Sequence, residues 1–273
     1  MISPIVSVDF IDRQEPTPYL LDVRWYLDGR DGHQAYRQGH IPGARFIDLD
    51  SVLAAPPSPA EGRHPLPTPQ VFADGLSELG VGDHDIVVAY DDLGGMVAGR
   101  LVWMLRILGF PAALLDGGLS AWTGPLETGD PSPAKPAPRT VMDWPSNAMA
   151  TADEVATHLD NGGVVIDARS PERYRGDSEP VDPRAGHIPG AINTPFNSNL
   201  DSEGRFIDRA ALRSRFEAAA SDDNPIVYCG SGVSACHNVL AMEAAGMNRP
   251  RLYVGSWSQW SSDPGRIAAT GDD

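Results

Sequence analysis

The chain has 273 residues, which is longer than one typical domain, so two domains of about 130 residues each are expected. Its formal net charge of −16 excludes the cationic surface that drives nucleic-acid binding, and an anionic membrane surface would repel the chain. An anionic substrate must therefore be held by a few local arginines and backbone N–H groups.

The cysteines and the apolar runs indicate which cellular compartment suits the chain. Cys229 and Cys236 lie close together in the sequence and do not look like a disulfide framework. Residues 1–10 lack a basic start and a long apolar core, so we expect no signal peptide. The longest apolar run, 101–115, is interrupted by arginine, glycine and proline, so we expect no membrane-spanning segment. A reducing cytoplasm fits these features.

Strands and helices alternate along the first half. Residues 20–24 predict a short strand that ends in polar residues, and 85–90 and 112–115 predict buried strands. Residues 69–79 show helical spacing, and another helix is expected over about 97–108. A proline-rich loop precedes the first of these helices.

The composition changes between the two halves. Six prolines and few apolar residues fall within 123–145, which predicts an extended linker. We therefore expect a first domain over 1–124, a proline-rich linker over 125–146 and a second domain over 147–273.

The second half repeats the first half in the same order. The segments 22–24, 39–44, 88–91 and 116–122 recur as 167–169, 186–191, 226–229 and 254–260. One pair, Gly-His-Ile-Pro-Gly-Ala, is identical residue for residue. Strands and helices alternate in both halves, which predicts an α/β protein with two tandem domains, each a parallel sheet with helices on both faces.

The stretch 228–237 carries the strongest chemical signal. Residues 225–228 predict a buried strand, and a helical pattern follows the glycines. Cys229 therefore falls at the tip of a strand, on a loop that opens into a helix. The loop N–H groups and the positive end of the helix dipole favour a thiolate and can cradle an anion beside it. The equivalent residue of the first half, Asp91, cannot perform sulfur chemistry.

The repeated Gly-His-Ile-Pro-Gly-Ala segments, the Asp-x-Arg strand ends and the Cys229 loop together resemble the tandem-domain sulfurtransferases of the rhodanese family. The resemblance covers nearly the whole chain and implies two rhodanese-like domains, of which only the second is catalytic. The loop is similar to that of 3-mercaptopyruvate sulfurtransferases, Cys-Gly-Ser-Gly-Val-Thr-Ala, from which only Ser234 departs while keeping the hydroxyl. Thiosulfate-preferring members usually carry cations directly after the cysteine, which suits a compact dianion.

The resemblance also implies how the donor is bound. Family enzymes hold the donor's carboxylate and carbonyl with arginines of the second domain, since a guanidinium presents a planar fork that suits a carboxylate. Arg173 matches the first of these arginines, and the second is Arg184 or Arg175. The loop residues expected to contact the donor are Gly230, Gly232, Val233 and Ser234.

A Ser-His-Asp relay is a further implication of the resemblance. Ser231 lies in the loop, and His64 and Asp50 match the family's histidine and aspartate segments. A histidine with an orienting carboxylate can move a proton to or from a serine hydroxyl near neutral pH. We therefore expect Cys229, Ser231, His64 and Asp50 to be the catalytic residues.

The implied reaction moves the sulfur of 3-mercaptopyruvate to Cys229 as a persulfide and releases pyruvate. A thiol such as reduced thioredoxin, or cyanide, then takes the sulfur. No metal or organic cofactor is implied, and the sequence lacks the clustered Cys/His spacing of a metal site.

Three other functions are compatible with parts of this pattern. A thiosulfate sulfurtransferase would use the same cysteine with a different donor. A cysteine phosphatase would place an arginine six residues after the cysteine, where this chain has Ala235. A non-catalytic sulfur carrier or binding module would share the fold, but the intact Cys229 loop and Arg173 argue against it. The sequence leaves the physiological acceptor and the oligomeric state open.

Overall fold

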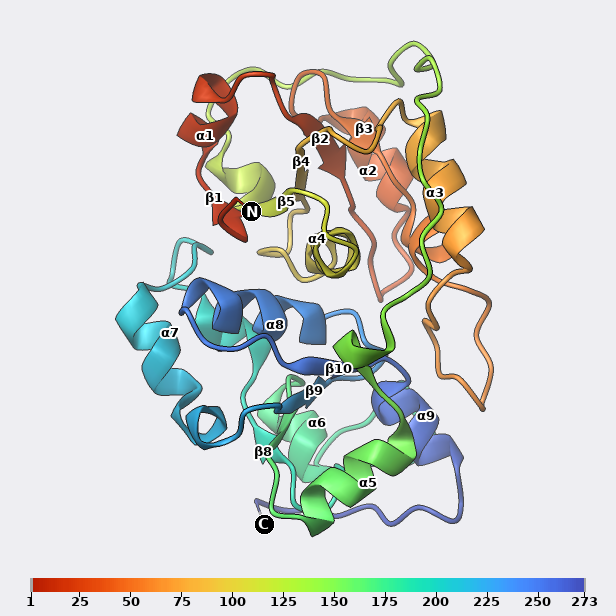
Figure 1. The fold of residues 1–273 in the computed structure, drawn as a ribbon, viewed down its shortest axis with the longest axis vertical. Helices are drawn as coiled ribbons and strands as arrows, with labels where there is room; N and C mark the ends of the chain where they lie inside the picture. Colours follow the sequence, from red (N-terminus) through yellow and green to blue (C-terminus); the bar gives the residue numbers. More distant parts are fainter. Residues whose placement is uncertain (1, 273) are drawn as a thin grey trace. The chain divides into compact units, whose positions relative to one another are not determined.

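The computed structural model describes residues 2–272, which form two compact units (Figure 1). The first unit consists of the chain up to Ala55, Pro67–Trp144 and Ser202–Phe206. The second consists of Pro56–Leu66, Pro145–Asp201 and the chain from Ile207 onward. The segment 56–66, which contains His64, thus packs with the second unit although it precedes the predicted linker.

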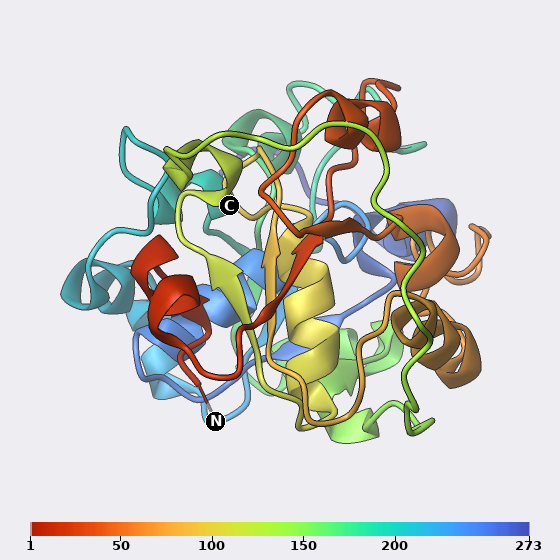
Figure 2. The same cartoon turned by 90° about the horizontal axis from the view of Figure 1, so that it is seen from above.

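The first unit contains a five-stranded parallel sheet with the strand order β1-β5-β4-β2-β3. Its strands are β1 (Ile5–Val6), β2 (Tyr19–Asp22), β3 (Arg45–Phe46), β4 (Val87–Tyr90) and β5 (Ala112–Leu115). Its helices are α1 (Val8–Arg13), α2 (Gly32–Gln38), α3 (Pro69–Glu78) and α4 (Ala98–Ile107), with short turns η1 (Leu49–Leu53) and η2 (Gly118–Ala121). Figure 2 shows α4, in yellow, running along the strands β4 and β5 on which it packs.

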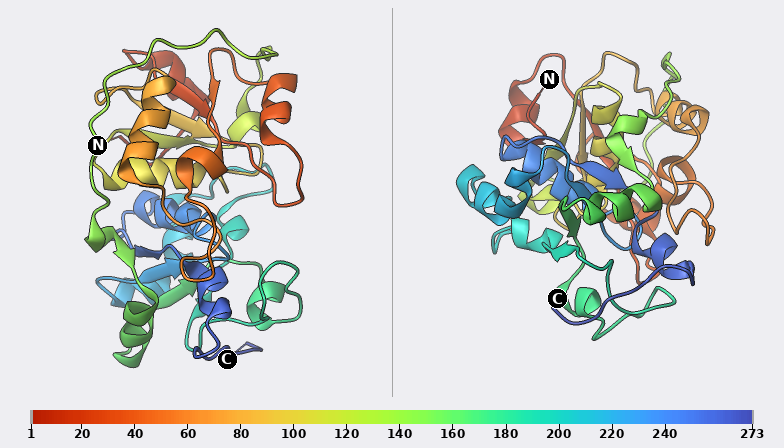
Figure 3. Two further views of the ribbon diagram at one scale, coloured as in Figure 1. Left: turned by 90° about the vertical axis from the view of Figure 1, so that its right-hand side faces the viewer. Right: turned by 60° about the horizontal axis from the view of Figure 1, so that its bottom comes forward.

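The second unit contains another five-stranded parallel sheet, in the order β6-β10-β9-β7-β8. Its strands are β6 (Met149–Ala150), β7 (Val165–Asp167), β8 (Ile192–Asn193), β9 (Ile226–Tyr228) and β10 (Arg251–Tyr253). Its helices are α5 (Ala152–Asp160), α6 (Pro171–Arg175), α7 (Arg209–Arg215), α8 (Ala235–Ala244) and α9 (Ser256–Ser262), with short turns η3 (Ser146–Ala148), η4 (Phe196–Asn199) and η5 (Glu217–Ser221). Figures 1 and 3 show α8 on one face of this sheet and α5 on the other.

The two sheets have the same topology. When β1 to β5 are matched in turn with β6 to β10, the strand orders are identical, so the sequence repeat is also a structural repeat. The prediction of two tandem α/β domains with parallel sheets is confirmed. The strands and helices predicted for the first half are observed as β2, β4, β5, α3 and α4. Within residues 2–272, no helix combines the length and apolar character needed to cross a bilayer.

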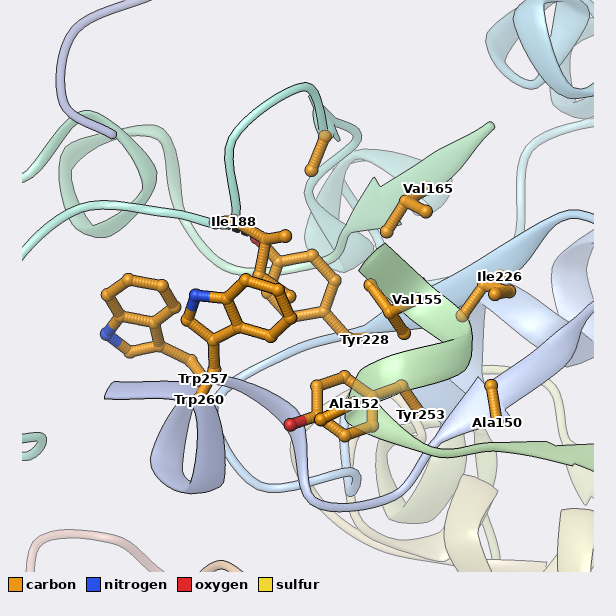
Figure 4. Close-up of a cluster of buried hydrophobic side chains, with 11 residues drawn as sticks. Ala150, Ala152, Val155, Val165, Ile188, Ile226, Tyr228, Tyr253, Trp257 and Trp260 are labelled. Carbon is orange, nitrogen blue, oxygen red and sulfur yellow. Dashed lines mark hydrogen bonds between the residues drawn. The ribbon is translucent and has the colours of Figure 1, made fainter. Parts of the chain in front are cut away.

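One hydrophobic core of the second unit lies between the sheet and the helices α5 and α9 (Figure 4). Ile226 and Tyr228 are alternate residues of β9, so both side chains point to this face. Val155 of α5 and the indoles of Trp257 and Trp260 of α9 pack against them. Each large side chain buried in this way contributes roughly 1.5–3 kcal/mol. This packing fixes α9 beside the end of β9, where Cys229 lies.

The repeated motifs build the same brace in each unit. In the second unit, Arg169 donates to the Asp167 carboxylate and to the carbonyl of Gly186, both at 2.7 Å. The hydroxyl of Tyr228 accepts from the N–H of Ile188 at 3.1 Å. The equivalent residues of the first unit are Asp22, Arg24, Gly39, Ile41 and Tyr90. The brace also occurs in the unit without a cysteine, so its role is structural.

Candidate active site

The loop of Cys229 lies where the strand order of the second sheet reverses. β9 pairs with β7 on one side and with β10 on the other, and the chain leaves β7 and β9 in opposite directions. Open parallel sheets bind ligands at such a position, outside the carboxyl ends of the strands. Cys229 follows β9 and the helix α6 with Arg173 follows β7, so the topology brings both to this edge.

The loop joins Cys229 to the helix α8, which begins at Ala235. Cys229 is 1% exposed, and the positive end of the α8 dipole lies at the end of its loop. Gly232 has φ 73°, a left-handed conformation that suits glycine. Val233 is also buried, and Ser234 is the cap residue of α8. Cys229 therefore lies buried at the end of β9, on the short loop that leads into the start of α8.

Backbone hydrogen bonds from α9 hold the carbonyls of the loop. The carbonyl of Cys229 accepts from the N–H of Trp257 at 2.9 Å, and the carbonyl of Gly230 accepts from the N–H of Ser258 at 2.9 Å. Both carbonyls are therefore engaged by α9 rather than directed at a bound anion. Such an arrangement leaves the binding of anions to the N–H groups of the loop.

Ser256 is a site residue that the sequence analysis did not single out. Its φ of 53° is the one positive value at a non-glycine residue within 2–272, and such strain costs about 1–3 kcal/mol. Its hydroxyl accepts from the N–H of Cys229 at 3.2 Å and donates to the carbonyl of Tyr253 at 2.8 Å. The sequence repeat could have indicated this position, because Ser256 aligns with Gly118 and glycine is common where φ is positive. Gly118 has φ 55°, close to that of Ser256.

His64 and Ser231 meet in the second unit. Nδ1 of His64 and Oγ of Ser231 are 2.8 Å apart, and each residue is 7% exposed. Ser231 comes from the cysteine loop, whereas His64 comes from the segment 56–66. The structure thus brings two of the predicted catalytic residues within hydrogen-bonding distance of each other. Ser231 also lies two residues after Cys229 in the sequence.

Asp50 lies in the first unit, in the turn η1. Its Oδ2 accepts a hydrogen bond from Nε1 of Trp25 at 3.0 Å. Its predicted role as the carboxylate that orients His64 stays a prediction.

Arg173 lies on α6 and is held on both sides by buried carboxylates. Its Nη2 donates to Glu179 at 2.7 Å and to Asp182 at 3.0 Å. Burial raises the pKa of Glu179, but hydrogen bonds from Arg173 and from backbone N–H groups outweigh it, so this pKa lies below its usual range. A Cβ atom at Gly230 would lie 3.3 Å from Nη1 of Arg173, so the guanidinium packs against the cysteine loop.

Arg184 and Arg175, the two candidates for a second substrate arginine, have other contacts. The guanidinium of Arg184 donates to four backbone carbonyls, at 2.7–2.8 Å, around the end of α9: those of Trp260, Ser261, Asp263 and Arg266. Arg175 pairs with Asp177 at 2.8 Å on the surface. Arg184 thus fixes the chain that follows α9. A substrate contact of Arg184 or Arg175 stays a prediction.

The family of the chain follows from a comparison with known proteins. The model of the rhodanese-like domain matches residues 8–125 and again 151–263. The chain belongs to the rhodanese family. A Pseudomonas aeruginosa protein named for 3-mercaptopyruvate sulfurtransferase activity is 43% identical, over 94% of each chain. A Mycobacterium tuberculosis protein named for thiosulfate sulfurtransferase activity, SseB, is 44% identical over 92% of this chain and 90% of its own.

A solved rhodanese-fold structure agrees with this assignment. The structure of SseA from Escherichia coli, titled as a 3-mercaptopyruvate sulfotransferase, superposes with a TM-score of 0.79 and 31% identity, over 94% of this chain and 99% of that one. The predicted tandem rhodanese architecture is confirmed, and so is the assignment of the chain to the sulfurtransferases of this family. The names of the relatives differ in the sulfur donor, so the donor must be argued from the site.

Proposed function

We propose that this rhodanese-family sulfurtransferase uses 3-mercaptopyruvate as its sulfur donor. The observation that carries the proposal is the contact of 2.8 Å between His64 and Ser231, next to a cysteine loop that has no cationic side chain between Cys229 and Ala235. When 3-mercaptopyruvate gives up its sulfur, pyruvate leaves as a carbanion equivalent that needs a proton source. When thiosulfate gives up its sulfur, sulfite leaves without needing a proton, and the thiosulfate dianion gains from nearby cations instead. The site has a proton source in Ser231 and His64, and the loop itself has no cationic side chain.

The first half-reaction transfers one sulfur atom. Arg173 binds the carboxylate of the donor, and the thiolate of Cys229 attacks the donor's sulfur. A sulfur–sulfur bond forms while the carbon–sulfur bond breaks, and the electron pair of that bond stays on carbon as the enolate of pyruvate. The outer sulfur remains on Cys229 as a persulfide, stabilised by N–H groups of the loop 230–235.

Ser231 and His64 supply the proton that turns the enolate into pyruvate. The serine hydroxyl donates to the forming carbanion and is reprotonated through His64. We assign Asp50 the orientation of His64. Neither a metal nor an organic cofactor takes part in this cycle.

The second half-reaction returns the enzyme to its thiolate. A nucleophile attacks the outer sulfur, the sulfur–sulfur bond breaks, and the electron pair returns to Cys229. Cyanide gives thiocyanate in this step, and a thiol such as reduced thioredoxin gives a new persulfide. We place the reaction in the cytoplasm, because both cysteines are free thiols, which a reducing compartment preserves.

The test compares the two donors with cyanide as acceptor. We expect kcat/KM for 3-mercaptopyruvate to exceed that for thiosulfate by at least about tenfold. Mass spectrometry after exposure to 3-mercaptopyruvate should show one extra sulfur atom on Cys229, and Cys229→Ser should show none. A preference for thiosulfate, the activity for which the Mycobacterium tuberculosis relative is named, would refute the proposed donor.

A further inference from the structure

Arg63 is a cation beside the cysteine loop that comes from outside the catalytic repeat. It precedes His64 in the segment 56–66, and its N–H donates to Oγ of Ser258 at 3.1 Å. A Cβ atom at Gly230 would lie 2.9 Å from Nη2 of Arg63. The guanidinium therefore packs against the residue that follows Cys229, and a side chain at position 230 would displace it.

Asp182 joins Arg63 to Arg173. One oxygen of its carboxylate accepts from Nη1 of Arg63 and the other from Nη2 of Arg173. The Asp182 side chain is 2% exposed, while those of Arg63 and Arg173 are 25% and 19% exposed. One buried carboxylate thus fixes two partly exposed guanidiniums side by side, and both of them face Gly230.

Two donor atoms of Arg63, Nε and Nη2, lie on the edge of its guanidinium that does not pair with Asp182. Nε is buried and forms no hydrogen bond within residues 2–272, and the ion pair with Asp182 uses Nη1. The edge formed by Nε and Nη2 is the fork that binds a carboxylate through two parallel hydrogen bonds. A buried donor without an acceptor is unfavourable, so this edge is suited to an acceptor that arrives with a ligand.

We propose that Arg63 is the second arginine that binds the carboxylate of the sulfur donor, together with Arg173, in the role that the sequence suggested for Arg184 or Arg175. The proposal rests on the proposed function for the identity of the donor. Asp182 is a positioning residue, because its carboxylate pairs with both guanidiniums and so holds them on the same side of Gly230. The segment that brings His64 to Ser231 therefore also brings a guanidinium that can bind a carboxylate at a distance from the sulfur.

Steady-state kinetics with 3-mercaptopyruvate and cyanide give the first test. In Arg63→Ala, KM should rise about 10- to 100-fold while kcat stays within about twofold, because ground-state and transition-state binding are lost together. Arg63→Lys should recover part of the loss, since lysine supplies the charge without the fork. Arg249→Ala, which breaks an ion pair with Glu243 elsewhere in the same unit, should leave both constants unchanged.

The kinetic constants distinguish donor binding by Arg63 from a purely structural role in holding His64. If Arg63 only anchored the segment that carries His64, then Arg63→Ala would lower kcat and leave KM close to that of the wild type. That outcome would overturn the proposal, and so would a rise in KM in Arg184→Ala or Arg175→Ala that Arg63→Ala does not share.

Alkylation of Cys229 gives a second test that does not depend on the donor. Iodoacetate and iodoacetamide have nearly the same size and reactivity but differ in the carboxylate. Mass spectrometry gives the rate constant of each reagent at Cys229. The rate constant for iodoacetate divided by that for iodoacetamide should fall about tenfold in Arg63→Ala and stay unchanged in Arg249→Ala. An unchanged ratio in Arg63→Ala would refute the role of Arg63 alone. A Cys229 that reacts with neither reagent would instead refute the proposed function.

Discussion

The loop that follows β4 in the first unit and the loop that follows β9 in the second occupy the same place in two matching sheets. In the first unit, the carboxylate of Asp91 is fully buried and accepts hydrogen bonds of 2.8–2.9 Å from four loop N–H groups. These N–H groups belong to Leu93, Gly95, Val97 and Ala98. The first unit therefore fills its own anion-binding loop with a side chain.

The second unit has an equivalent loop in which a different residue follows the strand. Cys229 replaces Asp91, and Gly232, with φ 73°, replaces Gly94, with φ 70°. A thiol is a much weaker hydrogen-bond acceptor than a carboxylate, so we expect the loop N–H groups of the second unit to remain for the outer sulfur of a persulfide. The loop thus recurs with the fold, and the second unit differs in having a nucleophilic cysteine where the first has a carboxylate.

The largest effect is expected from Cys229→Asp, which gives the second loop the residue that the first loop has at the equivalent position, Asp91. Sulfur transfer should fall by more than about 10⁴-fold, because a carboxylate is not a sulfur nucleophile. The unit should still fold, since the loop N–H groups can bind the new carboxylate as they bind Asp91. Thiocyanate formation and thermal unfolding measure the two effects, with Cys229→Ser as the control. An unfolded Cys229→Asp protein would show that the two loops differ more than the topology indicates.

The proton relay is the next difference, because Leu93 occupies the position of Ser231 in the first unit. Ser231→Ala and His64→Gln should each lower kcat with 3-mercaptopyruvate by about 10²- to 10⁴-fold. Combining them should cost little more than either change alone, since both act in one proton transfer. Single-turnover kinetics measure pyruvate release directly. Effects that multiply in the double variant would contradict a shared relay.

The sequence was sufficient for features that are local or repeated. The alternation of buried strands and helices predicted β4, β5, α3 and α4, and the repeat predicted two equivalent sheets. The position of Cys229 at the end of β9 followed from an apolar run that meets a glycine-containing loop. Hydrophobic periodicity and turn residues encode such features directly.

Long-range contacts were not predictable in the same way. Arg184 binds four backbone carbonyls around the end of α9, and every residue type offers a carbonyl, so no side-chain pattern signals such a cluster. Arg63 lies in a proline-rich segment whose packing with the second unit has no local signature. The sequence therefore predicted a second arginine as Arg184 or Arg175, and Arg63 could be proposed only after the structure placed it beside Gly230.

Asp91→Ala tests whether the first loop depends on its internal anion. The substitution leaves four N–H groups without their acceptor, so the free energy of unfolding should fall by about 3–5 kcal/mol. Asp91→Asn keeps one acceptor oxygen and should cost less. Urea unfolding with matched far-UV and fluorescence probes measures the loss. An Asp91→Ala protein as stable as the wild type would show that the carboxylate does not stabilise the loop.

The smallest effect is expected at Ser256, where the second unit has a strained serine and the first has Gly118. Ser256→Gly removes the hydroxyl that accepts from the N–H of Cys229 and also relieves the positive φ. Sulfur transfer should fall about 3- to 10-fold, in line with one lost hydrogen bond. The stability should change little, because the relieved strain of about 1–3 kcal/mol offsets the lost hydrogen bonds.

Ser256→Ala separates the two contributions. Alanine keeps the Cβ atom and with it the backbone strain, but it lacks the hydroxyl, so this variant should be less stable than Ser256→Gly by about 1 kcal/mol. Both variants should lose the same share of activity if the hydroxyl alone positions Cys229. If Ser256→Gly is fully active, the hydroxyl has no such role, and the strain at this position is then a consequence of packing against the loop rather than part of the catalytic device.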